Sequence, residues 1–508
     1  MNQGSKQYDQ QLARGALINL LGLVAKLVHP LFFLVITWFF GPDTMGLYQL
    51  VVLSLAEVAN SFVATGFQDA VMVYGSHHAD DPGPVAEAKL YRVLGNCFAF
   101  GVGASALLVG LTYLGADLLV EHVYPERPEI APALRVLCWS LPAMALSQIA
   151  IGATKARMHM QYDALINGLV KPLSLLGFSL LAYFVDAGLQ GLMLAQVATY
   201  LLQALLSLWA LQRHFDLGRV WQATAHLKPD RTVLRFAIPQ ALNMTANKFL
   251  TRVDVLLLGA FGYSNAQLAF YGAGALITTN LREVKLIFAG ALAPVAARHH
   301  ASGDRQSFED TLGKVSRWTT SIAVPAVLAV AVLRSDLMLV VHESYSGDTT
   351  FMLWLLVPPF LSCAYGLAGN CIVYTGHTTY TLFNSLLVAG LNTAFNWLMI
   401  PHWGLTGSAA ATAIASLLVS LLQVVELQKL EKVHLRWAAV WHPHVGMLLG
   451  MGVLAVLWDP AELPSLAARI AVAVGVAVLY GLFLYATKHP EMRAIVGRLT
   501  RRSSGAGA

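Results

Sequence analysis

Five basic residues lie near the middle of hydrophobic stretches that are long enough to cross a bilayer. They are Lys26, Lys248, Arg252, Arg282 and Lys285. A charged side chain at bilayer depth costs about 2.5–3.5 kcal/mol on insertion scales, so such residues face a bundle interior or a wet cavity. An excess of cations at this depth indicates an anionic cargo. Arg252 and Arg282 are the expected bidentate phosphate contacts, and the lysines act as point charges.

The charges at this depth do not balance. The basic groups are these five and Lys171, and the acids are Glu57, Asp69, Asp254 and Glu283, which leaves an excess of two positive charges. Structural ion pairs between helices would explain any single residue, but they cannot neutralise the whole set. A bound anion such as a pyrophosphate would complete the balance.

Other polar residues share helical faces with these cations. The candidates for the cavity wall are Asn19, His29, Asn247 and Thr278. Glu57 and Glu283 would hold the cations when the cavity is empty, or would accept a coupling proton, and Asp254 is a further candidate acid. Glu283 points away from the face that Arg282 and Lys285 share.

The elements that position these residues are membrane-spanning helices. Of the 508 residues, 56% are hydrophobic and 12% are charged, whereas a soluble domain carries about 25% charged residues. A spanning helix needs about 20 apolar residues, and the chain contains fourteen such stretches. They lie near 14–40, 47–75, 91–119, 132–153, 162–184, 189–211, 233–262, 267–295, 316–341, 351–374, 380–400, 404–426, 443–458 and 466–487. We therefore expect an all-α, multi-pass integral membrane protein.

The loop charges predict the orientation of these spans. An even number of spans places both termini on one side, and the loops on that side carry nearly all of the lysines and arginines. The opposite loops keep Arg127, Arg135, Arg334 and Arg469 and are otherwise acidic. By the positive-inside rule, both termini are cytoplasmic.

Short motifs recur at similar spacing in the two halves of the chain. Phe40-Gly41 matches Phe261-Gly262, Gly188-Leu-Gln-Gly191 matches Gly404-Leu-Thr-Gly407, and Tyr162-Asp-Ala-Leu-Ile-Asn167 resembles Tyr380-Thr-Leu-Phe-Asn384. Parallel repeats related by an axis along the membrane normal are a known transporter plan, with the substrate site between the halves. The repeat predicts two six-helix lobes related by a pseudo-two-fold axis, followed by two C-terminal helices.

This organisation gives four predicted segments. They are the first lobe at 1–211, a cytoplasmic linker at 212–232, the second lobe at 233–428, and the last two spans with a basic cytoplasmic tail at 429–508. No phosphate loop, catalytic serine motif or zinc motif occurs in the sequence. We therefore expect no enzyme, no cofactor and no metal site. Movement of the cargo would draw on a gradient such as H⁺ or Na⁺.

With these spans, repeats and cations, the chain resembles the polysaccharide-transport flippases, which include the O-antigen-type oligosaccharide-lipid flippases. They belong to the multidrug/oligosaccharidyl-lipid/polysaccharide exporter superfamily. The resemblance covers most of the chain and rests on degenerate motifs. These are Phe40-Gly-Pro-Asp-Thr-Met-Gly-Leu-Tyr48, Ala237-Ile-Pro-Gln240, Arg252-Val-Asp254-Val-Leu-Leu-Leu-Gly259 and Ala293-Pro294.

The resemblance implies two lobes that rock between inward-open and outward-open states in a bacterial cytoplasmic (inner) membrane. The implied cargo is an undecaprenyl-pyrophosphate-linked oligosaccharide for O-antigen, capsule or exopolysaccharide. A polysaccharide polymerase and glycosyltransferases would be partners, and no nucleic acid is expected. Lipid II flippases of the same superfamily place basic residues on the first, second and eighth spans. Lys26, Arg282 and Lys285 match that pattern, but Glu57 departs from it.

Two other classes of function remain alternatives. A multidrug or cation antiporter would share the fold, but it should carry an acid in place of Lys26 and a net negative cavity. A membrane enzyme acting on lipid-linked sugars would need catalytic side chains on the loops of one face. The acidic loop at 117–129 is the only candidate, and it has no recognisable catalytic pattern.

Overall fold

Every regular element that the structure describes is a helix, which confirms the predicted all-α class. The computed structural model describes residues 31–79, 83–226, 229–286, 288–289, 292, 304–375, 377–435, 437–456, 465–487 and 489. In these ranges, eight helices are long and apolar enough to cross a membrane. The number is nine if Thr350–Ala364 and Gly366–Tyr374, which meet at a bend of 44°, form one span.

The count of eight applies to the described residues and takes each continuous helical segment as one, so it does not test the fourteen predicted spans. Helix α18 (Thr378–Glu431) consists of two helices that meet at a kink at Gly404, and these lie at the predicted spans 380–400 and 404–426. The segment Leu31–Ser76 contains the second predicted span and the described end of the first. Helix α11 (Arg231–Ala260) occupies the predicted seventh span, but the charges in its middle lower its hydropathy. The count of fourteen stays a prediction.

The chain forms two compact units, Met1–Gly272 and Ala273–Ala508, and each is described by itself. The predicted boundaries at 211, 232 and 428 come from the sequence repeat, whereas the two units are defined by packing. The predicted boundaries therefore stay predictions.

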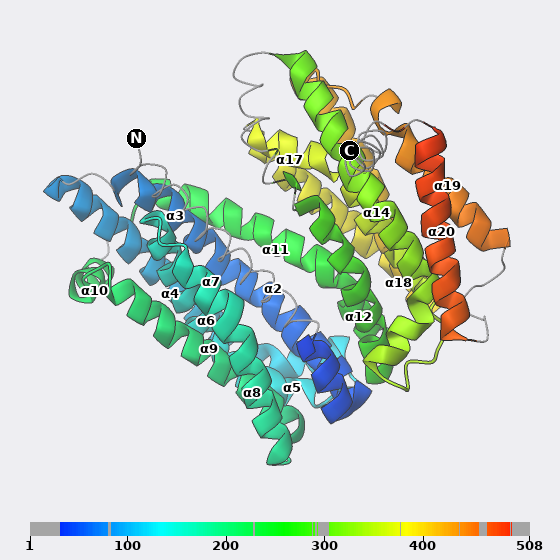
Figure 1. Ribbon diagram of the computed structural model, residues 1–508. Helices are drawn as coiled ribbons and strands as arrows, with labels where there is room; N and C mark the ends of the chain where they lie inside the picture. Colours follow the sequence, from blue (N-terminus) through cyan, green and yellow to red (C-terminus); the bar gives the residue numbers. More distant parts are fainter. Residues whose placement is uncertain are drawn as a thin grey trace, which may run out of the picture. The chain divides into compact units, whose positions relative to one another are not determined.

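The first unit is a bundle of long helices with one short helix across its end (Figure 1). After residues 31–48, its elements are the π-helix η1 (Gln49–Ala56), α2 (Glu57–Asn60), the π-helix η2 (Ser61–Thr65), α3 (Gly66–Ala79), α4 (Pro84–Val123), α5 (Ile130–Leu137), α6 (Ser140–Ala156), α7 (Gln161–Leu165), the π-helix η3 (Ile166–Val170), α8 (Lys171–Phe184), α9 (Gly188–Gln212), α10 (Leu217–Ala225) and α11. Helix α12 (Asn265–Thr279) begins in this unit.

Local sequence signals set where several of these helices begin. Pro84 occupies the first turn of α4, where a missing N–H costs nothing. The side chain of Asp216 accepts hydrogen bonds from the first turn of α10, and Asp230 does the same for α11. These N-caps satisfy backbone donors that the helix itself leaves free.

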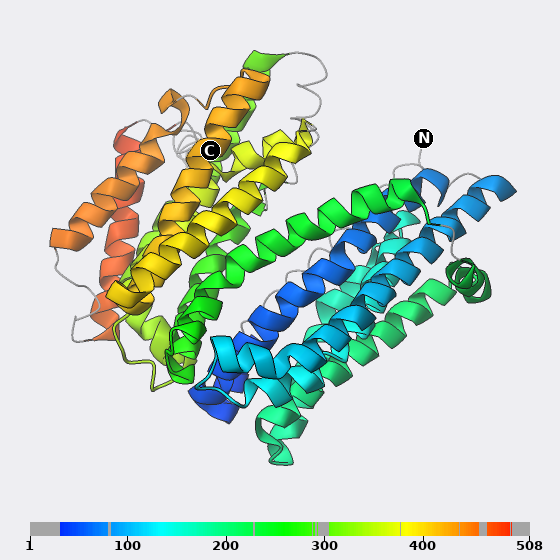
Figure 2. The same ribbon diagram turned by 180° about the vertical axis from the view of Figure 1, so that it is seen from behind.

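Helix α11 packs closely along the second predicted span, beside α2 and α3 in both views (Figures 1 and 2). A Cβ atom at Gly66 would lie 2.2 Å from the carbonyl oxygen of Ala237, so only glycine allows this approach. Near the same contact, Gln240 donates a hydrogen bond to Asp69 at 2.8 Å. This packing brings the middle of α11 beside Glu57.

The second predicted span is not a regular α-helix. The π-helices η1 and η2 lie on either side of α2, the four-residue segment that begins at Glu57. In η1, the Ser54 hydroxyl donates to the carbonyl of Gln49 at 2.9 Å. Short π segments inside α-helices frequently occur at functional sites.

The second unit contains the rest of α12 and the later helices. They are the 3₁₀-helix η4 (Asn280–Arg282), α14 (Arg305–Val341), α15 (Thr350–Leu355), α16 (Val357–Ala364), α17 (Gly366–Tyr374), α18 (Thr378–Glu431), α19 (Trp437–Val456) and α20 (Leu466–Ala486). Helices α19 and α20 pack on α14 through a core that includes Val324, Leu328 and Tyr480. An ion pair of 2.9 Å between Arg469 and Asp336 fastens α20 to α14.

The repeat seen in the sequence recurs in the backbone. Gly41 and Gly262 have φ values of +81° and +82°, and Gly188 and Gly404 have φ values of +54° and +56°. A positive φ is a conformation that L side chains rarely adopt, whereas glycine adopts it readily. Each pair therefore breaks the chain direction in the same way at equivalent positions of the two halves.

Candidate functional site

Two cations of α11 share one carboxylate of α2. Arg252 Nη2 donates to Glu57 Oε2 at 3.1 Å, and Lys248 Nζ donates to the same oxygen at 3.3 Å. The side chains are partly exposed, by 25% for Glu57, 28% for Arg252 and 48% for Lys248. Two positive charges against one negative charge leave this cluster with an excess of one. The Nε of Arg252 has no hydrogen-bond partner among the described residues.

Helical spacing explains why these groups meet. Lys248 and Arg252 are four residues apart, so they lie on one face of α11 one turn from each other. One turn further toward the start of α11, Thr245 accepts a hydrogen bond of 3.3 Å from Ser61, which is four residues after Glu57. Thr245 is a neighbour of the site that was not among the predicted residues, although its spacing of three from Lys248 places it on this face.

The remaining predicted residues of the first unit have other contacts. Asp254 is buried and accepts a hydrogen bond of 2.7 Å from the hydroxyl of Tyr271. The amide of Asn247 donates to the Asn243 carbonyl of its own helix at 2.9 Å. Lys171, which entered the charge count, lies over the ring of Tyr200 with its Nζ 4.9 Å from the centroid. No ion pair joins Lys171 to Glu57 in the described part of the chain.

The other two predicted cations belong to the second unit. Arg282 ends the 3₁₀-helix η4, and Glu283 follows it as a half-buried residue. Lys285 Nζ donates to the side-chain oxygen of Asn370 on α17 at 3.3 Å. The buried hydroxyl of Thr278 donates to the Gly274 carbonyl of α12 at 2.9 Å, so its proton is already used. The hydrogen bond from Lys285 makes Asn370 a neighbour of the predicted site, a contact that the sequence pattern alone does not predict.

Three predicted residues of the first span, Asn19, Lys26 and His29, lie outside the described residues. The roles of all the candidate side chains in binding or coupling stay predictions.

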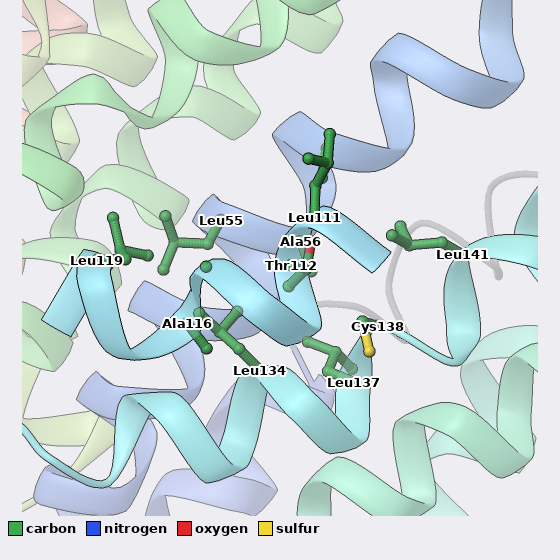
Figure 3. Close-up of a pocket in the computed structure, with 12 residues that line it drawn as sticks. Leu55, Ala56, Leu111, Thr112, Ala116, Leu119, Leu134, Leu137, Cys138 and Leu141 are labelled. Atoms are coloured by element: carbon green, nitrogen blue, oxygen red, sulfur yellow. The ribbon is translucent and has the colours of Figure 1, made fainter. Parts of the chain in front are cut away.

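An apolar pocket of about 260 Å³ lies beside the second predicted span, the one that carries Glu57 (Figure 3). Its walls come from η1 and α2, from α4, and from α5 and α6, with leucines such as Leu55, Leu111 and Leu137 around it. Of its twelve lining residues, Thr112 and Cys138 are the polar ones, and none carries a charge. A charged head group would lose its hydration there without compensation, so the ionic cluster around Glu57 is the better candidate for a polar ligand.

Comparison with known proteins gives three relevant findings. A family model described as polysaccharide biosynthesis protein matches residues 35–345. The probable low-salt glycan biosynthesis flippase Agl15 of Haloferax volcanii is 18% identical over 346 residues, which cover 67% of this chain and 70% of that protein. The lipid II flippase MurJ in an inward closed conformation superposes with a TM-score of 0.74 at 13% identity, covering 93% of this chain and 100% of that one.

A multidrug resistance MATE family transporter of the MOP superfamily, in its inward-facing conformation, also has a similar fold. Its TM-score is 0.61 at 14% identity, over 80% of this chain and 96% of the transporter. At such low identities, the likeness to solved structures concerns the fold. It confirms the predicted class of a helical integral membrane protein.

Proposed function

The chain belongs to the polysaccharide biosynthesis protein family, and from this premise we propose that it is a flippase for a lipid-linked oligosaccharide. The proposed cargo is an undecaprenyl-pyrophosphate-linked glycan, which would cross a bacterial inner membrane on its way to O-antigen, capsule or exopolysaccharide. The name of the related Agl15 protein, a probable glycan biosynthesis flippase, supports this assignment. Both termini would be cytoplasmic, and a polymerase and glycosyltransferases would supply and use the glycan.

The observation that carries the proposal is the sharing of Glu57 by Arg252 and Lys248. A carboxylate that neutralises only one of two cations acts as an incomplete counter-ion. A diphosphate brings more than one negative charge and several acceptor oxygens, and the fork of an arginine matches those oxygens bidentately. The arriving head group would therefore take over the two cations from Glu57.

Release would reverse this exchange. When the lobes reopen on the far side, Glu57 would pair again with Arg252 and Lys248 as the pyrophosphate leaves. The cations would thus never remain unpaired in a low dielectric, which would be costly. Arg282, Lys285 and Lys26 are the proposed further contacts of the head group, and a H⁺ or Na⁺ gradient is the proposed energy source. A net positive cluster disfavours the alternative of a cation antiporter.

Neutralising the two cations tests this proposal. In a strain that lacks the chromosomal gene, we expect Arg252→Gln and Lys248→Gln to lower surface glycan by roughly 10- to 100-fold, because a hydrogen bond to a charged group contributes about 1.5–3 kcal/mol. Lipid-linked glycan should accumulate on the inner leaflet. Surface glycan would be measured by gel and lectin staining, at matched amounts of protein in the membrane.

A matched control is Arg235→Gln, because Arg235 is an exposed cation in the first turns of the same helix. This variant should keep normal surface glycan. Normal export by a variant that lacks both Arg252 and Lys248 would remove them from the binding site. Increased sensitivity to cationic dyes without a loss of glycan would favour drug export instead.

A further inference from the structure

A second pocket lies beneath the short helix α10, and it is larger than the pocket beside Glu57. Its volume is about 520 Å³, within the range of roughly 300–1,000 Å³ that is usual for small-molecule sites. The lining comes from α4, α6, α9 and α10: Phe98, Ala99, Val102, Gly103, Leu146, Leu208, Leu211, Leu217, Val220, Trp221 and Thr224. Apart from Thr224 and the indole N–H of Trp221, these side chains are apolar. A hydrocarbon chain is the chemistry that fits this lining.

Helix α10 lies crosswise at the end of the bundle, since both views look along its axis while α4 and α9 run across the page (Figures 1 and 2). Several contacts hold it against α4. Arg219 forms an ion pair of 2.7 Å with Glu87, and its guanidinium lies over the ring of Tyr91 at 4.6 Å. A Cβ atom at Gly95 would lie 2.6 Å from the backbone of Ala223, so the two helices touch directly. The pocket beneath α10 is therefore preformed.

The edge of the pocket is suited to a membrane surface. Trp221 lines the pocket and is nevertheless 73% exposed, as is typical of tryptophans at the level of lipid head groups. A short amphipathic helix that lies across the ends of spanning helices is an interfacial helix, with its apolar side toward the acyl chains. The lining residues of α4, 98–103, follow the contact of Gly95 with α10 along the helix, so the pocket would lie at the depth where acyl chains begin.

A cation stands above the pocket on the same face of α4. Arg92 precedes Ala99 by seven residues and Gly103 by eleven, so the three share one helical face. Arg92 lies about 10 Å from Ala99 along the axis toward the helix start. It is exposed, and within the described part of the chain its guanidinium makes no hydrogen bond or ion pair. A phosphate at the membrane surface would give this cation a partner.

We propose that this pocket binds one acyl chain of an anionic phospholipid, with the phosphate of the head group against Arg92. The occupant would be a resident lipid and not the cargo. None of the lining residues comes from η1, α2 or α11, which carry the ionic cluster around Glu57. The proposal does not depend on which molecule the protein transports, so its failure and that of the flippase assignment can be told apart.

Filling the pocket tests the proposal. The full chain would be reconstituted in vesicles of phosphatidylethanolamine and phosphatidylglycerol that contain a trace of phosphatidylglycerol with a diazirine on one acyl chain. After illumination, mass spectrometry should locate the label on peptides that contain residues 98–103, 208–211 and 217–224. A Cβ atom at Gly103 would meet no atom within 4 Å, so Gly103→Trp should occupy the space without displacing a neighbour.

We expect Gly103→Trp to lower labelling roughly tenfold, which corresponds to about 1.4 kcal/mol, and the smaller Gly103→Leu to lower it less. Gly110→Trp is the matched control, because Gly110 is on the same helix, also faces open space and does not line the pocket. It should keep full labelling. Equal labelling of the wild type and Gly103→Trp would overturn the proposal.

The head group is tested with a second pair of probes. A phosphatidylcholine probe with the same diazirine should label the pocket less than phosphatidylglycerol does, and Arg92→Gln should remove this preference. Equal labelling of the wild type by both probes would overturn the role of Arg92. Labelling of these peptides by a diazirine polyprenyl phosphate and not by the phospholipids would show that the pocket belongs to the cargo, which would also overturn the proposal.

Discussion

At the scale of single residues, a histidine just beyond the end of α9 stacks on a histidine from the turn between α6 and α7. The rings of His159 and His214 stack with their centroids 3.9 Å apart, and His214 Nε2 lies 3.1 Å from the hydroxyl of Tyr162. Burial, together with the nearby His159, Arg157 and Arg213, lowers the pKa of His214 below its ordinary value. A proton on His214 is therefore bound more tightly in the unfolded chain than in the folded one.

This difference predicts a pH dependence of stability. The contribution of His214 to the free energy of unfolding is fully present above about pH 6.5, the ordinary pKa of histidine. It is lost as the pH falls through the lower pKa that His214 has in the folded protein. The thermal unfolding midpoint of the purified protein should therefore decrease between neutral pH and pH 5. In His214→Gln this decrease should be smaller, whereas His226→Gln, at an exposed position of the same linker, should behave like the wild type. An unchanged decrease in His214→Gln would contradict the argument.

The sequence indicated individual residues well where local spacing decides their position. Lys248 and Arg252 could be placed on one face because their spacing of four residues is that of a helical turn. Their pairing with Glu57 depends on the packing of α11 beside α2, and periodicity does not say which helices are neighbours. The contact of Asn370 with Lys285 is equally beyond prediction from spacing, since it joins α17 to the segment after η4.

At the scale of elements, glycines in unusual backbone conformations end and redirect the helices. Within α18 two helices meet at a kink at Gly404, whose φ and ψ of +56° and −131° are not helical. This region of backbone conformation is costly for any residue with a side chain. The equivalent position in the first half, Gly188, has a φ of +54°, so both halves depend on glycine at this point.

Replacing Gly404 should therefore destabilise the protein, because any side chain makes this backbone conformation costly. We expect Gly404→Ala to lower the free energy of unfolding by about 1–3 kcal/mol, measured as a lower thermal unfolding midpoint. Gly390 lies in the same helix with ordinary helical geometry, and its Cβ would meet open space. Gly390→Ala should stabilise the protein by about 0.5–1 kcal/mol. A stability effect of the same sign in both variants would show that the backbone at Gly404 is not the cause.

The repeated motifs were visible in the sequence because glycine is the residue that this backbone requires. One boundary between spans could be predicted for the same reason. The sequence predicts two spans, 380–400 and 404–426, because Pro401 and Gly404 interrupt the apolar pattern, and the structure has two helices that meet at a kink at Gly404. The π-helices beside Glu57 could not be predicted, since an added residue in a helical turn changes no composition and only shifts the helical period.

At the scale of the whole molecule, the distribution of charge predicts how the chain crosses the membrane. By the positive-inside rule, we expect the linker that holds α10 on the basic, cytoplasmic side and the loop between α14 and α15 on the opposite side. The orientation comes from the loops and not from the packing of the helices. The orientation is therefore a prediction that labelling can test.

Cysteine labelling would measure this orientation directly. The four native cysteines, Cys97, Cys138, Cys363 and Cys371, are unpaired and at most 3% exposed, so they should react little with a membrane-impermeant maleimide. In intact cells, Ser344→Cys in the exposed α14–α15 loop should be labelled and Gln222→Cys on α10 should not. In inverted vesicles the result should be reversed. Labelling of Gln222→Cys in intact cells would place the termini on the other side.

The π-helix η2 gives the second predicted span a way to change the direction of Glu57 without any substitution in the site. Its turn holds one residue more than an α-helical turn. Loss of a single codon between positions 61 and 65 would let this turn become α-helical, and the preceding part of the span would rotate by about 100° relative to α3. The Glu57 carboxylate would then no longer face Arg252, whereas Gly66 would keep its close contact with α11. Insertion or deletion of one codon in this segment would therefore rotate the part of the helix that carries Glu57. In the course of evolution, such changes could alter which charged side chains face the cargo.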